Sequence, residues 1–153
     1  MDKTVLKEKL SHKQPMLSSV LIEKSDTIEI IYPDILFIDF IPVFSEGALE
    51  VLKIYEPATI VKYINFIEGD GEDIKSYHIP ILKEVDCLSE KTVFKHGRQI
   101  DKGFLIKENI PDISIFKIAG EIDKEKTVIR ADFAESFLKR RLKGITLKSL
   151  EVV

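Results

Sequence analysis

The feature that most constrains the fold of this chain is a pair of β-branched and aromatic runs, residues 59–67 and 76–85. Between them, residues 68–73 read EGDGED, and Gly and Asp are favoured in tight turns. Two such runs joined by a short turn-forming segment predict a β-hairpin. Pro80 lies in the second run and has no N–H to donate to a ladder, so we expect this strand to lie at a sheet edge or to carry a bulge.

Two helices are predicted, one on each side of this hairpin. Ser45 has the side chain of an N-cap, Glu46 follows where the helix dipole favours a carboxylate, and the apolar residues from there to Tyr55 share one face. The second helix covers residues 132–143, and Gly144 after it suits a left-handed C-cap. Further strands are expected at 20–24 and 27–32, which form a first hairpin, and at 102–106, 113–118, 127–130 and 145–152.

These elements predict an α+β fold, a mostly antiparallel sheet with two or three packing helices, because strands and helices do not alternate regularly. The chain has 153 residues, the size of one domain, and a chain of this size buries roughly 70% of its unfolded surface. We expect residues 1–153 to form a single domain. Residues 1–57 would be an N-terminal hairpin and helix, and residues 58–153 a strand-rich body that ends in a helix and a strand.

Charge and cysteine content exclude several classes of protein. The net charge is −3, whereas a dedicated nucleic-acid binder usually carries a basic surplus. No apolar run is long enough to cross a bilayer, and no secretory signal is recognisable. Cys87 is the single cysteine, so an internal disulfide cannot form, which fits a reducing cytoplasm. We therefore expect a cytoplasmic protein that binds neither nucleic acid nor membrane.

No combination of residues predicts catalysis or metal binding. His12, His78 and His96 are widely spaced and never share a helix face at the i, i+4 separation of zinc ligands. Cys87 follows Asp86, whose charge raises the pKa of the thiol and opposes a nucleophilic role. The acidic segment 68–73 lacks the glycine and the final glutamate that a calcium-binding loop requires. We predict no enzyme activity, no metal and no cofactor.

A basic cluster lies at the end of the second predicted helix and consists of Lys139, Arg140, Arg141 and Lys143. Cations at a helix C-terminus complement the helix dipole, and binding of nucleic acid through this helix is the alternative interpretation. Arg141 falls in the middle of the apolar face of this helix. Its side chain is expected either to extend past the last turn into solvent or to meet a buried carboxylate.

Four segments resemble a known family. They are residues 77–89 (YHIPILKEVDCLS), 115–118 (IFKI), the strand, helix and strand between 128 and 147, and the helix start at 43–49 (VFSEGAL). In this order they resemble the immunity-protein-eleven family of bacterial polymorphic toxin systems, over about residues 40–150. The resemblance implies a small α+β protein that binds and neutralises a cognate toxin, with no catalytic motif to carry over. The chain departs from the family pattern at residues 130–132 (RAD) and in its last strand, which lacks an aromatic residue.

Two functions stand as hypotheses beside the nucleic-acid binding named above for the basic cluster. The first is an immunity or inhibitor protein that covers a cognate protein toxin. Its partner-binding residues are predicted at Glu68, Asp70, Glu72 and Asp73, because these carboxylates suit the basic cleft of a nuclease. The second is a small-ligand-binding or enzymatic α+β domain, whose pocket would contain Tyr63, Tyr77, His78 and Arg141. Tyr77 and Arg141 are also candidates for a structural role.

Overall fold

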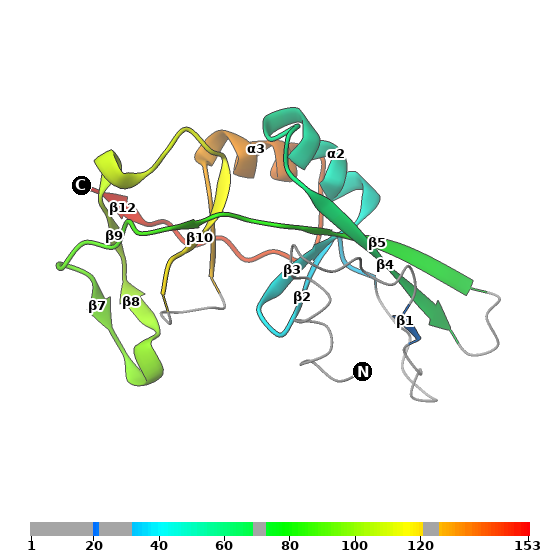
Figure 1. Cartoon of the computed structure of the whole chain (residues 1–153), viewed down its shortest axis with the longest axis horizontal. Helices are drawn as coiled ribbons and strands as arrows, with labels where there is room; N and C mark the ends of the chain where they lie inside the picture. Colours follow the sequence, from blue (N-terminus) through cyan, green and yellow to red (C-terminus); the bar gives the residue numbers. More distant parts are fainter. Residues whose placement is uncertain (1–19, 22–31, 69–72, 121–125) are drawn as a thin grey trace.

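The computed structural model describes residues 20–21, 32–68, 73–120 and 126–153. It is an α+β fold with mostly antiparallel sheets, as the sequence predicts. Two helices, α2 (Glu46–Tyr55) and α3 (Ala131–Lys139), lie on one side of a five-stranded sheet (Figure 1). Short strands extend the molecule away from this sheet, toward the end where the C-terminus lies.

The five-stranded sheet is built around one long hairpin. Its strand order is β1-β4-β5-β3-β2. β4 and β5 pair antiparallel over eight residues each, which confirms the predicted hairpin, and β1 runs parallel to β4. The strands are β1 Val20–Leu21, β2 Ile35–Ile38, β3 Ile41–Phe44, β4 Val61–Glu68 and β5 Asp73–Pro80.

The prediction that the strand containing Pro80 lies at a sheet edge or carries a bulge is wrong, because β5 lies between β4 and β3 and pairs with β4 in an unbroken register. Pro80 is the last residue of β5, and β3 pairs with β5 at Phe44, which lies opposite His78. Pro80 has no backbone N–H, but it is the end of the strand and lies beyond this bridge, so the ladder does not need a hydrogen bond from it.

The hairpin formed by β2 and β3 was not predicted. The two strands pair over four residues each, and the two residues between them, Asp39 and Phe40, have φ angles of 47° and 69°. Two positive φ angles in a two-residue connection are typical of a type I′ turn, whose usual sequence contains Asn or Gly. The sequence signal is absent here because Phe40 occupies a position that favours glycine.

α2 forms over the residues that the sequence predicts. Ser45 Oγ accepts a hydrogen bond from the N–H of Ala48 at 3.2 Å and donates one to Asp34 Oδ1 at 2.8 Å. The cap therefore also ties the start of the helix to the chain before β2. The inward face of α2 carries four buried side chains, those of Ala48, Leu49, Val51 and Leu52.

The buried side chains of α2, α3 and the adjacent strands form a core that we call the first core, and α3 contributes aromatic rings to it. Phe137 packs edge-on against Phe44, with ring centroids 6.1 Å apart, and Phe133 packs against Tyr55 at 5.3 Å. Phe133 and Phe137 are themselves in contact, with centroids 4.9 Å apart. The two helices are thus held together by rings that also pack on the sheet.

α3 ends earlier than predicted, at Lys139. Arg141 has a φ angle of 55°, its N–H bonds to the carbonyl of Leu138 at 3.0 Å, and the N–H of Leu142 bonds to the carbonyl of Phe137 at 3.2 Å. These two bonds around a left-handed residue form a Schellman motif. Arg141 therefore occupies the C-cap position that the sequence analysis assigns to Gly144.

The second half of the chain forms short strands around a separate core. β10 pairs parallel to β6 and antiparallel to β11, β7 pairs with β8, and β9 pairs parallel to β12. The elements are β6 Glu84–Val85, β7 Val93–Phe94, β8 Ile100–Lys102, β9 Phe104–Leu105, β10 Ile115–Ile118, β11 Thr127–Ile129 and β12 Glu151–Val152. Two 3-10 turns, His96–Arg98 and Lys107–Asn109, join some of these strands.

Several predicted strands differ from the observed ones. The run 102–106 is divided at Gly103, because Lys102 ends β8 while Phe104 begins β9. The run 145–152 contributes only β12, because the residues before it cross from one core to the other. Ile145 packs on the first core and Leu150 on the second. The predicted first hairpin lies outside the described residues, apart from β1 and Tyr32.

The C-terminal segment, residues 140–153, connects the two halves. The carbonyl oxygen of Lys143 accepts hydrogen bonds from the N–H groups of Asp34 at 2.9 Å and Ile35 at 3.2 Å. Gly144 has a φ angle of 97°, and a Cβ at this position would overlap the carbonyl oxygen of Ile35. Beyond this contact the segment reaches β9, where it pairs as β12. Within the described ranges, no helix combines the length and apolar character needed to span a bilayer.

Candidate functional site

The candidate site is the outer part of the β4–β5 hairpin, on the side of the sheet that carries the helices. His78 marks this side, because its Nε2 lies 2.8 Å from Glu46 Oε2 in the first turn of α2. Side chains alternate along a strand, so every second cross-strand pair beyond His78 faces the same side as His78. In Figure 1 the two strands extend past both helices. We call this region the hairpin surface; it consists of Tyr63, Asn65, Ile67, Ile74 and Ser76.

Apolar side chains are exposed on the hairpin surface. Tyr63 is 50% exposed and Ile74 is 60% exposed, although both belong to strands that are paired along their length. Between them, Ser76 Oγ donates a hydrogen bond to Asn65 Oδ1 at 2.7 Å. Exposed apolar groups that gather on one face are typical of surfaces that contact another protein. The ladder holds these groups in place before any partner arrives.

Two of the four predicted acidic contact residues belong to the described part of the β4–β5 hairpin. Glu68 and Asp73 are opposite each other at the last register of the hairpin. Asp70 and Glu72 lie outside the described residues. The contact between these four carboxylates and a partner stays a prediction.

Tyr77 lies on the opposite side of the sheet and has a structural role. Its side chain is fully buried, and its hydroxyl donates a hydrogen bond to the carbonyl oxygen of Pro33 at 2.6 Å. The ring of Phe66 packs edge-on against it at 5.3 Å. Burial, with the charge of Asp34 nearby, raises the pKa of Tyr77 to about 12. The phenol therefore stays neutral and holds the chain before β2 against the sheet.

The structure does not bring the predicted pocket residues together. Tyr63 and His78 are cross-strand neighbours, but Tyr77 points away from them to the other face. Arg141 is exposed at the end of α3, so its side chain extends into solvent instead of meeting a buried carboxylate. The early end of α3 causes this outcome, because Arg141 no longer lies on a helical face.

The basic cluster after α3 is partly neutralised. Arg140 Nη1 lies 3.2 Å from Glu50 Oε2 of α2, and both side chains are largely solvent-accessible. Lys139, Arg141 and Lys143 are exposed. The Arg140–Glu50 pair joins the outer sides of the two helices, and exposed pairs of this kind contribute about 0.2–1 kcal/mol.

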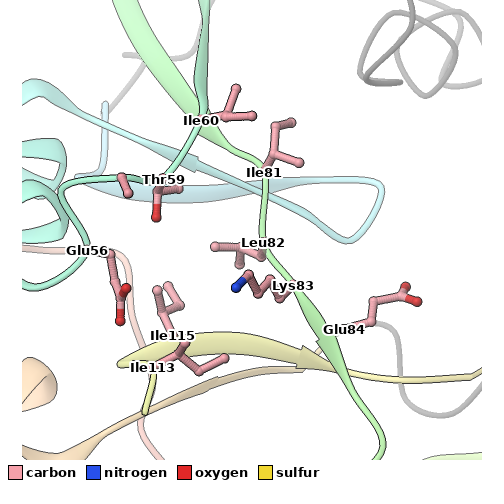
Figure 2. A pocket seen from close by; sticks show the side chains of 10 residues that line it. Glu56, Thr59, Ile60, Ile81, Leu82, Lys83, Glu84, Ile113 and Ile115 are labelled. Carbon is pink, nitrogen blue, oxygen red and sulfur yellow. The ribbon is translucent and has the colours of Figure 1, made fainter. Parts of the chain in front are cut away.

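A cleft of about 540 Å³ lies elsewhere, where the first core meets the second. Its walls come from the end of α2, from the chain between β5 and β6, and from the approach to β10 (Figure 2). The lining is mostly apolar, with Glu56 and Lys83 as the charged groups that point inward in Figure 2. The sequence analysis missed this cleft, because residues from three distant segments form it and no spacing pattern links them. The lining residues are Glu56, Ala58, Thr59, Ile60, Ile81, Leu82, Lys83, Glu84, Ile113 and Ile115.

Cys87 and the histidines form no reactive group in the described part of the chain. Cys87 is fully buried in the second core, and burial together with the charge of Asp86 raises the pKa of its thiol, as predicted. His96 is exposed in the first 3-10 turn. Among the residues that the structure describes, no three His, Cys, Asp or Glu side chains are placed to hold a metal ion.

Comparison of the chain with protein-family models, with characterised proteins and with solved structures gave no match in any of the three. The resemblance to the immunity family therefore depends on the four sequence segments alone.

Proposed function

We propose that this chain is an immunity or inhibitor protein that binds a cognate bacterial toxin in the cytoplasm and neutralises it by steric occlusion. The single observation that carries the proposal is the hairpin surface, where Tyr63 and Ile74 are half or more exposed on a fully paired ladder that extends past the helices. The family resemblance implies that the partner is a protein toxin. The activity is binding, without turnover of a substrate.

The composition of the hairpin surface suits a protein partner, and the neighbouring acidic residues favour a partner with a basic surface. Tyrosine offers a large apolar area and a hydroxyl at a low cost in conformational entropy, and it is enriched where binding energy concentrates. Asn65 and Ser76 add polar groups between the apolar ones. The acidic residues at the end of the hairpin would lie at the rim, where charge steers association and selects the partner.

The proposal predicts that the gene next to the one for this chain encodes a toxin, and it is tested with the toxin domain of that product; a neighbouring gene with no toxin domain would count against the proposal. Growth of a bacterial host that produces this toxin is measured with and without the chain, and binding is measured with the purified proteins. The chain should restore growth and bind the toxin directly. Tyr63→Asp and Ile74→Asp should each weaken binding by about tenfold or more, because each places a charge in an apolar contact.

Ile54→Asp is the matched control. Ile54 is 64% exposed on α2, so its substitution changes charge and exposed apolar area to the same degree as Ile74→Asp, but away from the hairpin. The control should keep full protection. Equal losses for Ile54→Asp and Ile74→Asp would contradict the assignment of the contact, and absence of any protection or binding would contradict the function.

Charge reversal tests the acidic residues separately. Replacing Asp70, Glu72 and Asp73 together with lysine should slow association with the toxin by about tenfold. The difference in association rate from the unmodified chain should be larger at low salt, because salt screens the charges. Unchanged affinity and association rate would remove these residues from the contact, whereas Tyr63 and Ile74 would keep their assignment.

A further inference from the structure

The cleft between the two cores has the charge arrangement of a site for a small zwitterion. Five isoleucine and leucine side chains supply most of its apolar wall. In Figure 2 the carboxylate of Glu56 lies on one side and the ammonium group of Lys83 points in from the other, with Ile115 between them and Leu82 above Lys83. A volume of about 540 Å³ is within the usual size of small-molecule sites. The apolar side chains are Ile60, Ile81, Leu82, Ile113 and Ile115.

Glu56 is the fixed element of this cleft. It follows α2 directly, and its own N–H bonds to the carbonyl oxygen of Leu52 at 2.7 Å. Its Oε1 accepts a hydrogen bond from the N–H of Ser114, a residue that is almost fully buried. A carboxylate has about four acceptor positions. Acceptor capacity therefore remains on the side of Glu56 that faces the cleft, and the hydroxyl of Thr59 points into the same space (Figure 2).

Lys83 is held opposite by its backbone. Its carbonyl oxygen accepts a hydrogen bond from the N–H of Lys117 at 2.8 Å, which ties the segment between β5 and β6 to β10. Glu84, the next residue, points away from the cleft in Figure 2. In the described part of the chain, Lys83 and Glu56 form no ion pair with each other, so the two charges stand apart across apolar side chains.

We infer that this cleft binds an apolar dipeptide with free termini, with its ammonium group at Glu56 and its carboxylate at Lys83. Figure 2 shows Glu56 and Lys83 on different sides of the cleft, and an extended dipeptide likewise carries its two charges at opposite ends. Two extended residues span about 7 Å and place the two charges at opposite ends. The side chains of the dipeptide would lie against the isoleucine and leucine residues, where burial of apolar surface is favourable. This site is separate from the hairpin surface and does not depend on the proposed function.

The test uses the full chain and the dipeptide Leu-Leu as probe, with binding measured by calorimetry and by backbone amide shifts. Binding should shift the amides of Ser114 and Lys83, and N-acetylation or C-amidation of the probe should each weaken it by about tenfold or more. Glu56→Gln keeps an acceptor for the N–H of Ser114 but removes the charge. It should weaken Leu-Leu by about tenfold and make the free and acetylated probes bind equally.

Two further variants complete the test. Lys83→Met keeps the apolar stem and should remove the preference for the free carboxylate. Glu135→Gln, a matched control for Glu56→Gln at an exposed residue of α3 outside the cleft lining, should bind Leu-Leu like the unmodified chain. No binding of Leu-Leu at millimolar concentration would overturn the inference. Equal binding of free and blocked probes by the unmodified chain would also overturn it. Protection against the toxin, measured with Glu56→Gln, should be unchanged, so either proposal can fail without the other.

Discussion

One part of the molecule, which we call the first half, consists of the five-stranded sheet with α2 and α3 and has strands of up to eight residues. The other, the second half, consists of strands β6 to β12, which have two to four residues each. The first half packs three phenylalanine rings between its helices and sheet. The described core of the second half contains one, Phe116. Backbone ladders and packed aromatic rings thus stabilise the first half, and the second half needs other support.

That support comes from side chains and from the C-terminal segment. Thr92 Oγ1 both donates to the carbonyl oxygen of Phe104 and accepts from its N–H, each at 3.2 Å, so it replaces a strand bond. Lys148 Nζ donates to the carbonyl oxygen of Asp101 at 2.7 Å. Leu150 packs on the second core, over Gly103. A half with short strands is stable here because distant segments satisfy its backbone groups.

The largest effect is expected from cutting the aromatic contacts of the first core. Phe137→Ala should lower the free energy of unfolding by about 4 kcal/mol, because it removes a buried ring and its contacts with Phe44 and Phe133. Phe116→Ala, the equivalent change in the second core, should cost about 3 kcal/mol. Urea denaturation of both variants measures the difference. A larger loss for Phe116→Ala would show that the second half is the more tightly packed one.

A smaller but still large effect is expected where the C-terminal segment crosses the first half. Gly144→Ala should destabilise the protein by about 3 kcal/mol, because the new Cβ overlaps the carbonyl oxygen of Ile35 and the φ angle is positive. Gly120→Ala is the control, with a φ angle of 96° and no heavy atom within 4 Å of the added Cβ. It should cost about 1 kcal/mol, from the backbone alone. Similar losses at both positions would contradict the close contact of Gly144 with β2.

Tyr77 gives a prediction that depends on pH. The pKa of its phenol is raised from 10.0 to about 12 in the folded state, so the stability that this shift contributes is fully present below pH 10 and is lost as the pH rises from 10 to 12. Tyr77→Phe should cost about 1 kcal/mol at neutral pH, for the hydrogen bond to Pro33.

The difference between the unmodified chain and Tyr77→Phe should therefore shrink above pH 10, as measured by urea denaturation at a series of pH values. Tyr63→Phe serves as the control, because Tyr63 is half exposed on the other face of the sheet. A constant difference across this pH range would show that the phenol of Tyr77 titrates normally in the folded state.

The smallest effect is expected at the end of α3. Arg141→Gly should stabilise the protein by up to about 1 kcal/mol, because glycine adopts the left-handed conformation without the steric cost that arginine bears. Thermal unfolding of the variant, with Arg140→Gly as a control at a residue of ordinary φ, measures the gain. Destabilisation by Arg141→Gly would imply that the arginine side chain makes a contact that outweighs its backbone strain.

Local patterns in the sequence predicted some elements well and others poorly. α2 was predicted residue for residue, because its cap, its apolar face and its end at Pro57 are all set by neighbours within a few positions. The β4–β5 hairpin followed from two runs with strong β propensity. The β2–β3 turn and the end of α3 were missed, because Phe40 and Arg141 adopt positive φ angles that only the surrounding packing imposes.

The candidate site shows the same division. The acidic and aromatic residues of the hairpin were visible in the sequence, but the exposure of Tyr63 and the burial of Tyr77 were not. Tyr63 lies on the helix side of the sheet, beyond the ends of the helices, whereas Tyr77 lies on the opposite side, where Tyr32 and Phe66 pack against it. The pairing of Glu56 with Ser114, and the cleft around them, join residues 58 positions apart. No periodicity connects positions at such a distance.

The amino-acid sequence by itself therefore determined the α+β class, the long hairpin, α2 and the absence of an internal disulfide, since propensity, capping and composition act over short distances along the chain. The tertiary structure alone decided the place of β5 inside the sheet, the left-handed end of α3 and the meeting of Glu56 and Lys83 at one cleft. These features arise when the C-terminal segment and α3 pack against strands formed much earlier in the chain, and the free energy of such contacts depends on shapes that no local pattern encodes.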